Sequence, residues 1–220
     1  MKQNGHLEME LPHPVFETIF ENEGWICGGF VRDYIIRGEG FDLTRKINVL
    51  IPYCFVHSLL RDLKENFRVR TRNLNNFLLN SEENLEIQVD QFIFDISSSE
   101  DHSYQQPADV DVNTLCWIQK EVSYCVRRDG KEVSGIQFER NGILQKFRKE
   151  DQIYSWKNFT TKDEVKYGIK LTISEICRRC LRKEAVLLSE DWKKSDNQYN
   201  HNFSVQLDEL SLKGWTLISK

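Results

Sequence analysis

The stretch Gly24–Pro52, GWICGGFVRDYIIRGEGFDLTRKINVLIP, contains the pattern that decides the fold. It predicts a short buried strand at WIC, a bend at Gly28–Gly29 and a helix over FVRDYIIRG. Gly38 closes that helix as a C-terminal cap. A continuous apolar strand, KINVLIP, follows and ends at Pro52. This succession of strand, helix and strand predicts an α/β arrangement.

Working outward, the period of the apolar residues predicts further elements on both sides. Residues 13–24 and 53–67 have helical spacing. Beyond them the period shortens, and we expect strands at 67–73, 75–81 and 85–96. In the third of these, Glu86 and Asp90 would share one polar face.

The pattern changes again in the second half of the chain. A hairpin is expected to turn at Asp129–Gly130. After Asn141 the pattern becomes mainly helical, and a capping-box pattern opens a helix over 172–192. We therefore predict an α/β (α+β) domain over residues 1–140 and a small helical region over 141–220, packed on the first.

The composition is that of an ordinary soluble protein, with 40% hydrophobic residues, 29% charged residues and a net charge of −4. No apolar run reaches the length of a membrane span, and the N-terminal residues lack a secretory signal. The six cysteines fit no secreted disulfide framework. We expect reduced thiols in a cytoplasmic or nuclear protein that does not enter a membrane.

A strand followed by paired glycines and a helix is a natural anion site. Glycines let a backbone approach phosphate closely, and the first N–H groups of a helix point toward it. Arg32, in the first turn, would add a forked donor for phosphate oxygens. The alternative is that Gly28–Gly29 only makes a tight turn and that Arg32 pairs with an acidic side chain at the surface.

Two motifs together resemble a known family. Gly28–Asp33, GGFVRD, resembles the GG-x-VRD signature of the tRNA CCA-adding enzyme and bacterial poly(A) polymerase family. That family belongs to the DNA polymerase beta-like nucleotidyltransferase superfamily. Ala108–Trp117, ADVDVNTLCW, resembles the family's R-D-F-T-x-N-A-L segment, with Asp109 and Asn113 on its Asp and Asn. The resemblance covers residues 14–118 and implies a nucleotidyltransferase-type mixed sheet flanked by helices.

The resemblance implies a role for each matching residue. The glycines would cradle a nucleoside triphosphate, and the other matching residues would brace the phosphates or line the sugar side. The implied nucleotide-binding residues are Gly28, Gly29, Arg32, Asp33, Asp109 and Asn113. Glu86 or Asp90, in the strand LEIQVD, would be the distal carboxylate.

The chain departs from the family at the Asp-x-Asp pair that follows the GG-x-VRD helix. Two side chains at i and i+2 on a strand face the same side and can hold magnesium together. Aligned on the strand, the pair falls at Lys46 and Asn48, and aligned on the loop it falls at Asp42 and Thr44. Lys46 in the first position would neutralise part of a triphosphate without metal.

The candidate catalytic residues are therefore the remaining carboxylates, Asp42, Glu86 and Asp90, and Lys46 joins the nucleotide-binding residues. A single Mg²⁺ ion would use Asp42 and Glu86, because magnesium prefers one or two protein carboxylates plus phosphates and water.

Two other features suggest partners. Residues 140–184 contain twelve Lys or Arg and six Asp or Glu, which indicates either an RNA-binding surface or a solvated helix face. Cys177 and Cys180 have the spacing of half a zinc site, but both lie on an apolar helix stripe, which favours core packing.

Three functional hypotheses remain open. The first is a nucleotidyltransferase that moves a nucleoside monophosphate from an NTP to RNA or another acceptor. The second is an inactive relative that binds a nucleotide, an RNA or a protein partner. The third is a protein-interaction module that has only the fold. The size resembles small nucleotidyltransferase-like proteins of microbes and large DNA viruses, which implies a host cytoplasm or nucleus for a viral protein.

Overall fold

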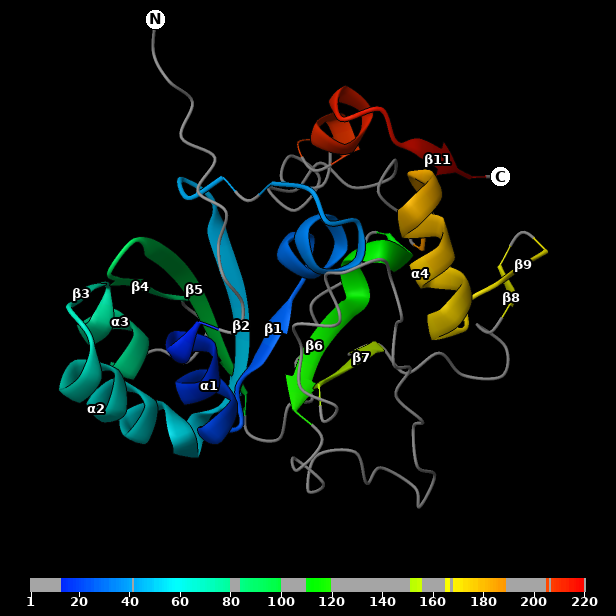
Figure 1. Cartoon of the computed structure of the whole chain (residues 1–220). Helices are drawn as coiled ribbons and strands as arrows, with labels where there is room; N and C mark the ends of the chain where they lie inside the picture. Colours follow the sequence, from blue (N-terminus) through cyan, green and yellow to red (C-terminus); the bar gives the residue numbers. More distant parts are fainter. Residues whose placement is uncertain are drawn as a thin grey trace, which may run out of the picture.

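The computed structural model of the chain is built on a seven-stranded mixed sheet flanked by helices (Figure 1). It describes residues 13–40, 42–79, 84–99, 110–119, 151–155, 165–166, 168–188, 205 and 207–219. Within these ranges no helix is long and apolar enough to cross a membrane. The predicted α/β class, with a mixed sheet and flanking helices, is confirmed.

The strands follow the order β3-β4-β5-β2-β1-β6-β7. Their bounds are β1 Trp25–Cys27, β2 Lys46–Pro52, β3 Val69–Arg72, β4 Leu85–Val89, β5 Phe92–Ser99, β6 Leu115–Gln119 and β7 Asp151–Ser155. The β2–β5 pair is parallel, and the other neighbours are antiparallel. Residues 53–84 connect β2 to the antiparallel strands β4 and β5 and supply β3 at the edge of the sheet.

One face of the sheet packs on the main core. The helices on that face are α1 Pro14–Glu21, the π-wound helix η1 Phe30–Ile36 and α2 Val56–Asn66. In β2 the side chains of Ile47, Val49 and Ile51 point into this core, whereas Lys46 and Asn48 are exposed on the opposite side. The alternation follows from the two-residue period of a strand. We call the opposite side of β2, β5, β4 and β3 the polar face.

Several predicted elements are present at the expected places. The helix expected over 13–24 is α1, and the strands WIC and KINVLIP are β1 and β2. The helix expected over 53–67 is α2, preceded by a short 3₁₀ turn, η2 Tyr53–Phe55. Gly38 adopts a φ of +68° after η1, so it caps that helix as predicted.

Two predicted strands were wrong. Residues 75–81 were expected to form a strand, but α3 Leu74–Leu79 is helical. The strand expected over 85–96 is in fact the β4–β5 hairpin, which turns at Asp90 with a φ of +51°. Asp tolerates this left-handed conformation better than most residues, so an apolar period could not locate the turn.

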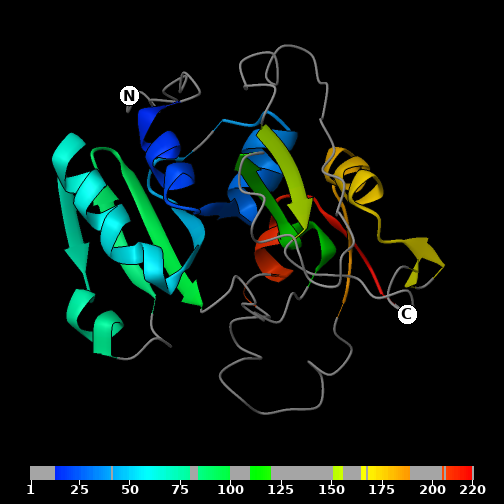
Figure 2. The same cartoon turned by 90° about the horizontal axis from the view of Figure 1, so that it is seen from below.

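The second half of the chain is less helical than predicted. Its described residues include α4 Ile173–Arg182 and a helical turn over 207–212, but also β7, β8 Val165–Lys166, β9 Ile169–Lys170, β10 Glu184–Val186 and β11 Thr216–Ile218. Figure 2 shows α2 and α4 at opposite ends of the molecule, with η1 and β6 between them. The boundary at 140/141 and the turn at Asp129–Gly130 lie outside the described residues.

α4 is shorter than the sequence predicted. It ends at Lys183, whose left-handed φ of +56° turns the chain into β10, and the Thr172 side chain makes no capping hydrogen bond. Cys177 and Cys180 are fully buried and belong to the main core, together with Ile176 and Trp215. The core therefore includes side chains from both halves of the chain, and η3 Asp111–Thr114 lies where α4 packs.

Candidate functional site

The Gly28–Gly29 bend connects β1 to η1. Gly28 has a φ of +72°, and a Cβ there would lie 3.2 Å from the Asn48 Nδ2 atom. Only glycine adopts this conformation without strain, and it lets β2 pass close by. The Gly28 N–H donates to the Leu115 carbonyl at 3.1 Å, so this amide is used within the sheet. Gly29 is α-helical, with a φ of −59°.

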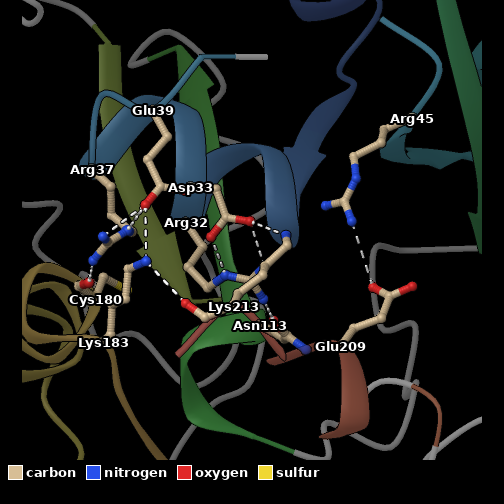
Figure 3. Close-up of polar contacts among 10 residues, drawn as sticks. All are labelled: Arg32, Asp33, Arg37, Glu39, Arg45, Asn113, Cys180, Lys183, Glu209 and Lys213. Atoms are coloured by element: carbon tan, nitrogen blue, oxygen red, sulfur yellow. Dashed lines mark hydrogen bonds and ion pairs between the residues drawn. The ribbon is translucent and has the colours of Figure 1, made fainter. Parts of the chain in front are cut away.

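The Arg32 guanidinium is held inside the protein (Figure 3). Its Nε and Nη2 atoms donate to the two Asp33 carboxylate oxygens at 2.6 Å each, and Nη1 donates to Asn113 Oδ1 at 2.5 Å. Only 6% of Arg32 is exposed. The fork ties η1 to η3 through Asp33 and Asn113, and its role at a phosphate stays a prediction. Arg32 thus connects the helix that follows the glycine bend to η3.

The C-terminal segment completes this network, which the sequence did not predict. Lys213 Nζ lies 2.8 Å from Asp33 Oδ2, and the Trp215 ring lies 5.0 Å from the Arg32 guanidinium carbon (Figure 3 shows the polar contacts). Burial alone would raise the Asp33 pKa, but hydrogen bonds and charges from Arg32 and Lys213 outweigh it and lower the pKa. Asp33 therefore stays ionised at neutral pH.

Arg37 makes a second connection between η1 and the rest of the molecule. It donates to Glu39 Oε1 at 2.8 Å and to the carbonyl of Cys180 in the last turn of α4. Its guanidinium carbon also lies 5.6 Å from the Trp215 ring, which Arg32 contacts as well. A cation at the C-terminal end of a helix is favourable. Both arginines of η1 are thus structural anchors.

The polar face carries two of the residues that the sequence proposed for nucleotide binding and catalysis, Lys46 and Glu86. Asn48 on β2 is the register partner of Asp95 on β5, and Asp95 is the partner of Glu86 on β4. Lys46, two residues before Asn48, places its Nζ atom 2.9 Å from Glu86 Oε2. Arg72 on β3 reaches the other Glu86 oxygen at 3.3 Å. Amide, carboxylates and cations thus form one row across adjacent strands.

The charges in this row stabilise one another. The hydrogen bond from Lys46 lowers the pKa of Glu86, and the same bond raises the pKa of Lys46. Lys46 is therefore protonated and Glu86 ionised at neutral pH. The Lys46 side chain is half exposed, so it can turn from Glu86 to another anion.

Asp95 is the carboxylate that lies between Asn48 and Glu86 on the polar face. It lies on β5 between the buried Phe94 and Ile96, and it accepts a hydrogen bond from the Asn84 amide at 3.0 Å. The alternation FIFDI places it on the polar face, but its position beside Asn48 depends on the pairing of β2 with β5. That pairing joins segments far apart in the chain, and the spacing of apolar residues does not predict which strands pair.

The other predicted carboxylates lie elsewhere. Asp42 is exposed in the loop before β2, where its Oδ1 accepts bonds from the Thr44 N–H and hydroxyl at 2.9 and 2.7 Å. Asp90 lies in the β4–β5 turn, just after the last residue of β4, whereas Glu86 lies near the start of that strand. The Asp90 carboxylate accepts a hydrogen bond from the Arg68 N–H. The prediction that Glu86 and Asp90 share one face of a strand is therefore wrong. Asp109 lies outside the described residues.

The polar face does not fit a two-ion magnesium centre. The two β2 positions that face it hold an ammonium and an amide, and Lys46 already lies at ion-pair distance from Glu86. A bridging carboxylate pair is what that chemistry requires. In the described part of the chain, no three His, Cys, Asp or Glu side chains are grouped as metal ligands would be.

A buried ion pair between α4 and η3 holds η3 in place. Arg179 on α4 donates through Nε to Asp111 Oδ2 at 2.7 Å, and the Val186 N–H donates to Asp111 Oδ1 at 2.7 Å. Both charged side chains are at most 2% exposed. Burial raises the Asp111 pKa, and the Arg179 charge opposes that shift. The pair fixes η3, which presents Asn113 to Arg32.

The described part of the basic segment 140–184 is largely paired within the protein. Arg178 and Arg182 form ion pairs with Glu175 and Glu184, and Lys183 donates to the Lys213 carbonyl at 3.0 Å. These contacts are those of a solvated helix face and a structural connection. Most of the segment's other lysines and arginines lie outside the described residues.

Comparison of the chain with protein-family models, with curated proteins and with solved structures gives no significant match.

Proposed function

We propose that the protein is nucleotidyltransferase-like and binds a nucleoside triphosphate on the polar face without a two-ion magnesium centre. The observation that carries the proposal is the pair of side chains at i and i+2 on β2. Lys46 and Asn48 are both exposed there, and Asn48 abuts the Gly28 bend. An ammonium and an amide are donors that can bind phosphate oxygens directly.

An anionic ligand would compete with the carboxylates of this row. Lys46 and Arg72 are balanced by Glu86 and Asp95, so the row carries no net charge. A triphosphate approaching the Gly28 bend would compete with Glu86 for the Lys46 ammonium. Such an exchange is feasible because the side chain is long, flexible and half exposed.

Transfer of a nucleoside monophosphate is the competing hypothesis. It would need carboxylates that hold metal beside the phosphates, and the described donor set does not fit that requirement. Metal-dependent incorporation of labelled nucleotide would therefore contradict the proposal. A protein-interaction module, the third hypothesis, would bind no nucleotide under any condition.

A second feature favours an RNA strand as a further ligand. Arg68, Arg70 and Arg72 are exposed at alternate positions along the edge strand β3 and the residue before it. Side chains two apart on a strand are about 6.7 Å apart and lie on one face. This regular row of cations borders the polar face and suits the backbone of a single strand.

The proposal is tested by thermal unfolding with each of the four NTPs, in magnesium and in excess EDTA. A ligand at one hundred times its Kd adds about 2.7 kcal/mol of stability, which shifts the melting temperature measurably. We expect stabilisation in both conditions. Lys46→Met should remove it, whereas Lys64→Met on the exposed side of α2 is the matched control. Stabilisation in magnesium alone would contradict the metal-independent site.

A further inference from the structure

Two cysteines face each other directly behind the glycine bend. Cys27 on β1 and Cys116 on β6 are register partners, and their Sγ atoms lie 3.1 Å apart. The bond from the Gly28 N–H to the Leu115 carbonyl makes the next pair of residues hydrogen-bonded. Cys27 and Cys116 are therefore a non-hydrogen-bonded pair, in which the Cα atoms approach to about 4.5 Å. That separation lies within the range that a disulfide spans.

The surroundings distinguish this pair from the other thiols that the structure describes. Cys27 and Cys116 lie in a small apolar cluster with Trp25, Leu50 and Ile118, on the side of the sheet opposite the main core. Cys27 is 4% exposed and Cys116 is fully buried. Cys27 is therefore the thiol of the pair that an oxidant meets first.

The two α4 thiols are poorer candidates. Burial raises the Cys177 pKa to about 12 and also raises the Cys180 pKa, so neither forms thiolate readily. Cys54 is exposed and serves as an internal comparison, because access alone would favour its oxidation.

We propose that Cys27 and Cys116 are a site of reversible disulfide formation, driven by hydrogen peroxide and reversed by a low-molecular-weight thiol. The Cys27 sulfur attacks one peroxide oxygen, the O–O bond breaks, and a sulfenic acid forms with release of water. The Cys116 sulfur then attacks the Cys27 sulfur, the S–O bond breaks, and a second water leaves. The two thiols lose two electrons to the peroxide, and the sulfur atoms close by about 1 Å.

The bond would act on the proposed nucleotide site, and this consequence rests on the proposed function. Cys27 immediately precedes Gly28 and is also the register partner of Asn48. A covalent link to β6 fixes the backbone of β1 at the residue before Gly28, so the bend loses freedom to adjust to a ligand beside Asn48. We therefore expect the oxidised protein to bind nucleotide several-fold more weakly than the reduced protein.

The test uses the full chain, reduced and then titrated with hydrogen peroxide, followed by peptide mass mapping without reductant. The expected product is a Cys27–Cys116 cross-linked peptide, with the loss of two hydrogens from the intact mass and recovery on reduction. The cross-link should be absent from Cys116→Ser and retained in Cys54→Ser. If Cys116→Ser does not fold, mapping of the wild-type chain alone decides the question.

Oxidation of Cys54 with no Cys27–Cys116 peptide would overturn the inference, as would separate overoxidation of the two cysteines. Failure of the proposed function gives a different result. In that case the cross-linked peptide forms, but neither the reduced nor the oxidised protein binds nucleotide.

Discussion

The Lys46 ammonium lies 2.9 Å from the Glu86 carboxylate, on the face of the sheet that the Gly28 bend borders. This contact puts a positive charge where a divalent cation would need oxygen ligands. Asn48, on the same side of the strand, adds an amide in place of a second carboxylate. The account of a metal-independent phosphate site depends on these two residues.

Placing two carboxylates on β2 should create metal affinity. In the double variant Lys46→Asp/Asn48→Asp the new carboxylates would face Asp95 and Glu86 across adjacent strands. We expect calorimetry to detect binding of Mn²⁺ that the wild-type protein lacks. Lys64→Asp/Asn66→Asp makes the same charge change on exposed positions of α2 and should bind no ion. Equal behaviour of the two variants would show that the polar face is not shaped for a cation.

Loss of the buried arginine should destabilise the whole protein. Arg179→Met leaves the Asp111 charge buried without its partner, and breaking such a pair costs about 3–5 kcal/mol. Adding Asp111→Asn removes that charge and keeps an acceptor for the Val186 N–H, so the double variant should recover part of the loss. Urea unfolding measures both. A change of less than about 1 kcal/mol for Arg179→Met would mean that the pair is unimportant.

Stability should fall in mildly acidic solution through His13. Its Nδ1 atom accepts the Val15 N–H at 3.2 Å as the N-cap of α1. Burial lowers the His13 pKa from 6.5, and the Asp90 charge opposes that shift. The unfolded chain therefore takes up the proton first, so stability is full above pH 6.5 and is lost as the pH falls through it.

The matched variant is His13→Asn, which keeps a capping acceptor but does not titrate. Its unfolding free energy should change less than that of the wild type between about pH 7.5 and about pH 5.5. Identical pH profiles for the two proteins would rule out His13 as the group responsible.

The β3 arginines should govern the salt dependence of RNA binding. Each phosphate contact to a single strand contributes about 0.7 to the slope of log K against log salt. Arg70→Gln/Arg72→Gln should therefore weaken binding of a short single-stranded RNA and reduce that slope by about 1.4. Arg61→Gln, an exposed position on α2, is the control. An unchanged slope would remove β3 from the RNA surface.

Local patterns in the sequence predicted much of the first half of the fold. The period of apolar residues located α1, β2 and α2, and the glycine signals located the bend and the end of η1. The strand predicted over 75–81 was wrong because three consecutive apolar residues, 77–79, fit a strand as well as the short helix that contains them.

The site was predicted only in part because it depends on tertiary pairing. The sequence proposed Lys46 and Glu86 for the site separately, and the structure brings the two side chains together. Asp95 comes beside Asn48 through the parallel β2–β5 pair, which joins segments far apart in the chain. Trp215 and Lys213 reach η1 from the other end of the chain, where no local signal marks them. Arg32 donates to Asp33 and Asn113, and its contact with a ligand stays a prediction.

The most direct measurement of the central claim is isothermal titration of ATP into the wild-type protein and into Lys46→Met, both in excess EDTA. The account predicts that the wild type binds without metal and that the variant binds at least about tenfold more weakly, a difference of about 1.4 kcal/mol. Lys64→Met should match the wild type. ATP binding that needs magnesium, or that Lys46→Met leaves unchanged, would contradict the account.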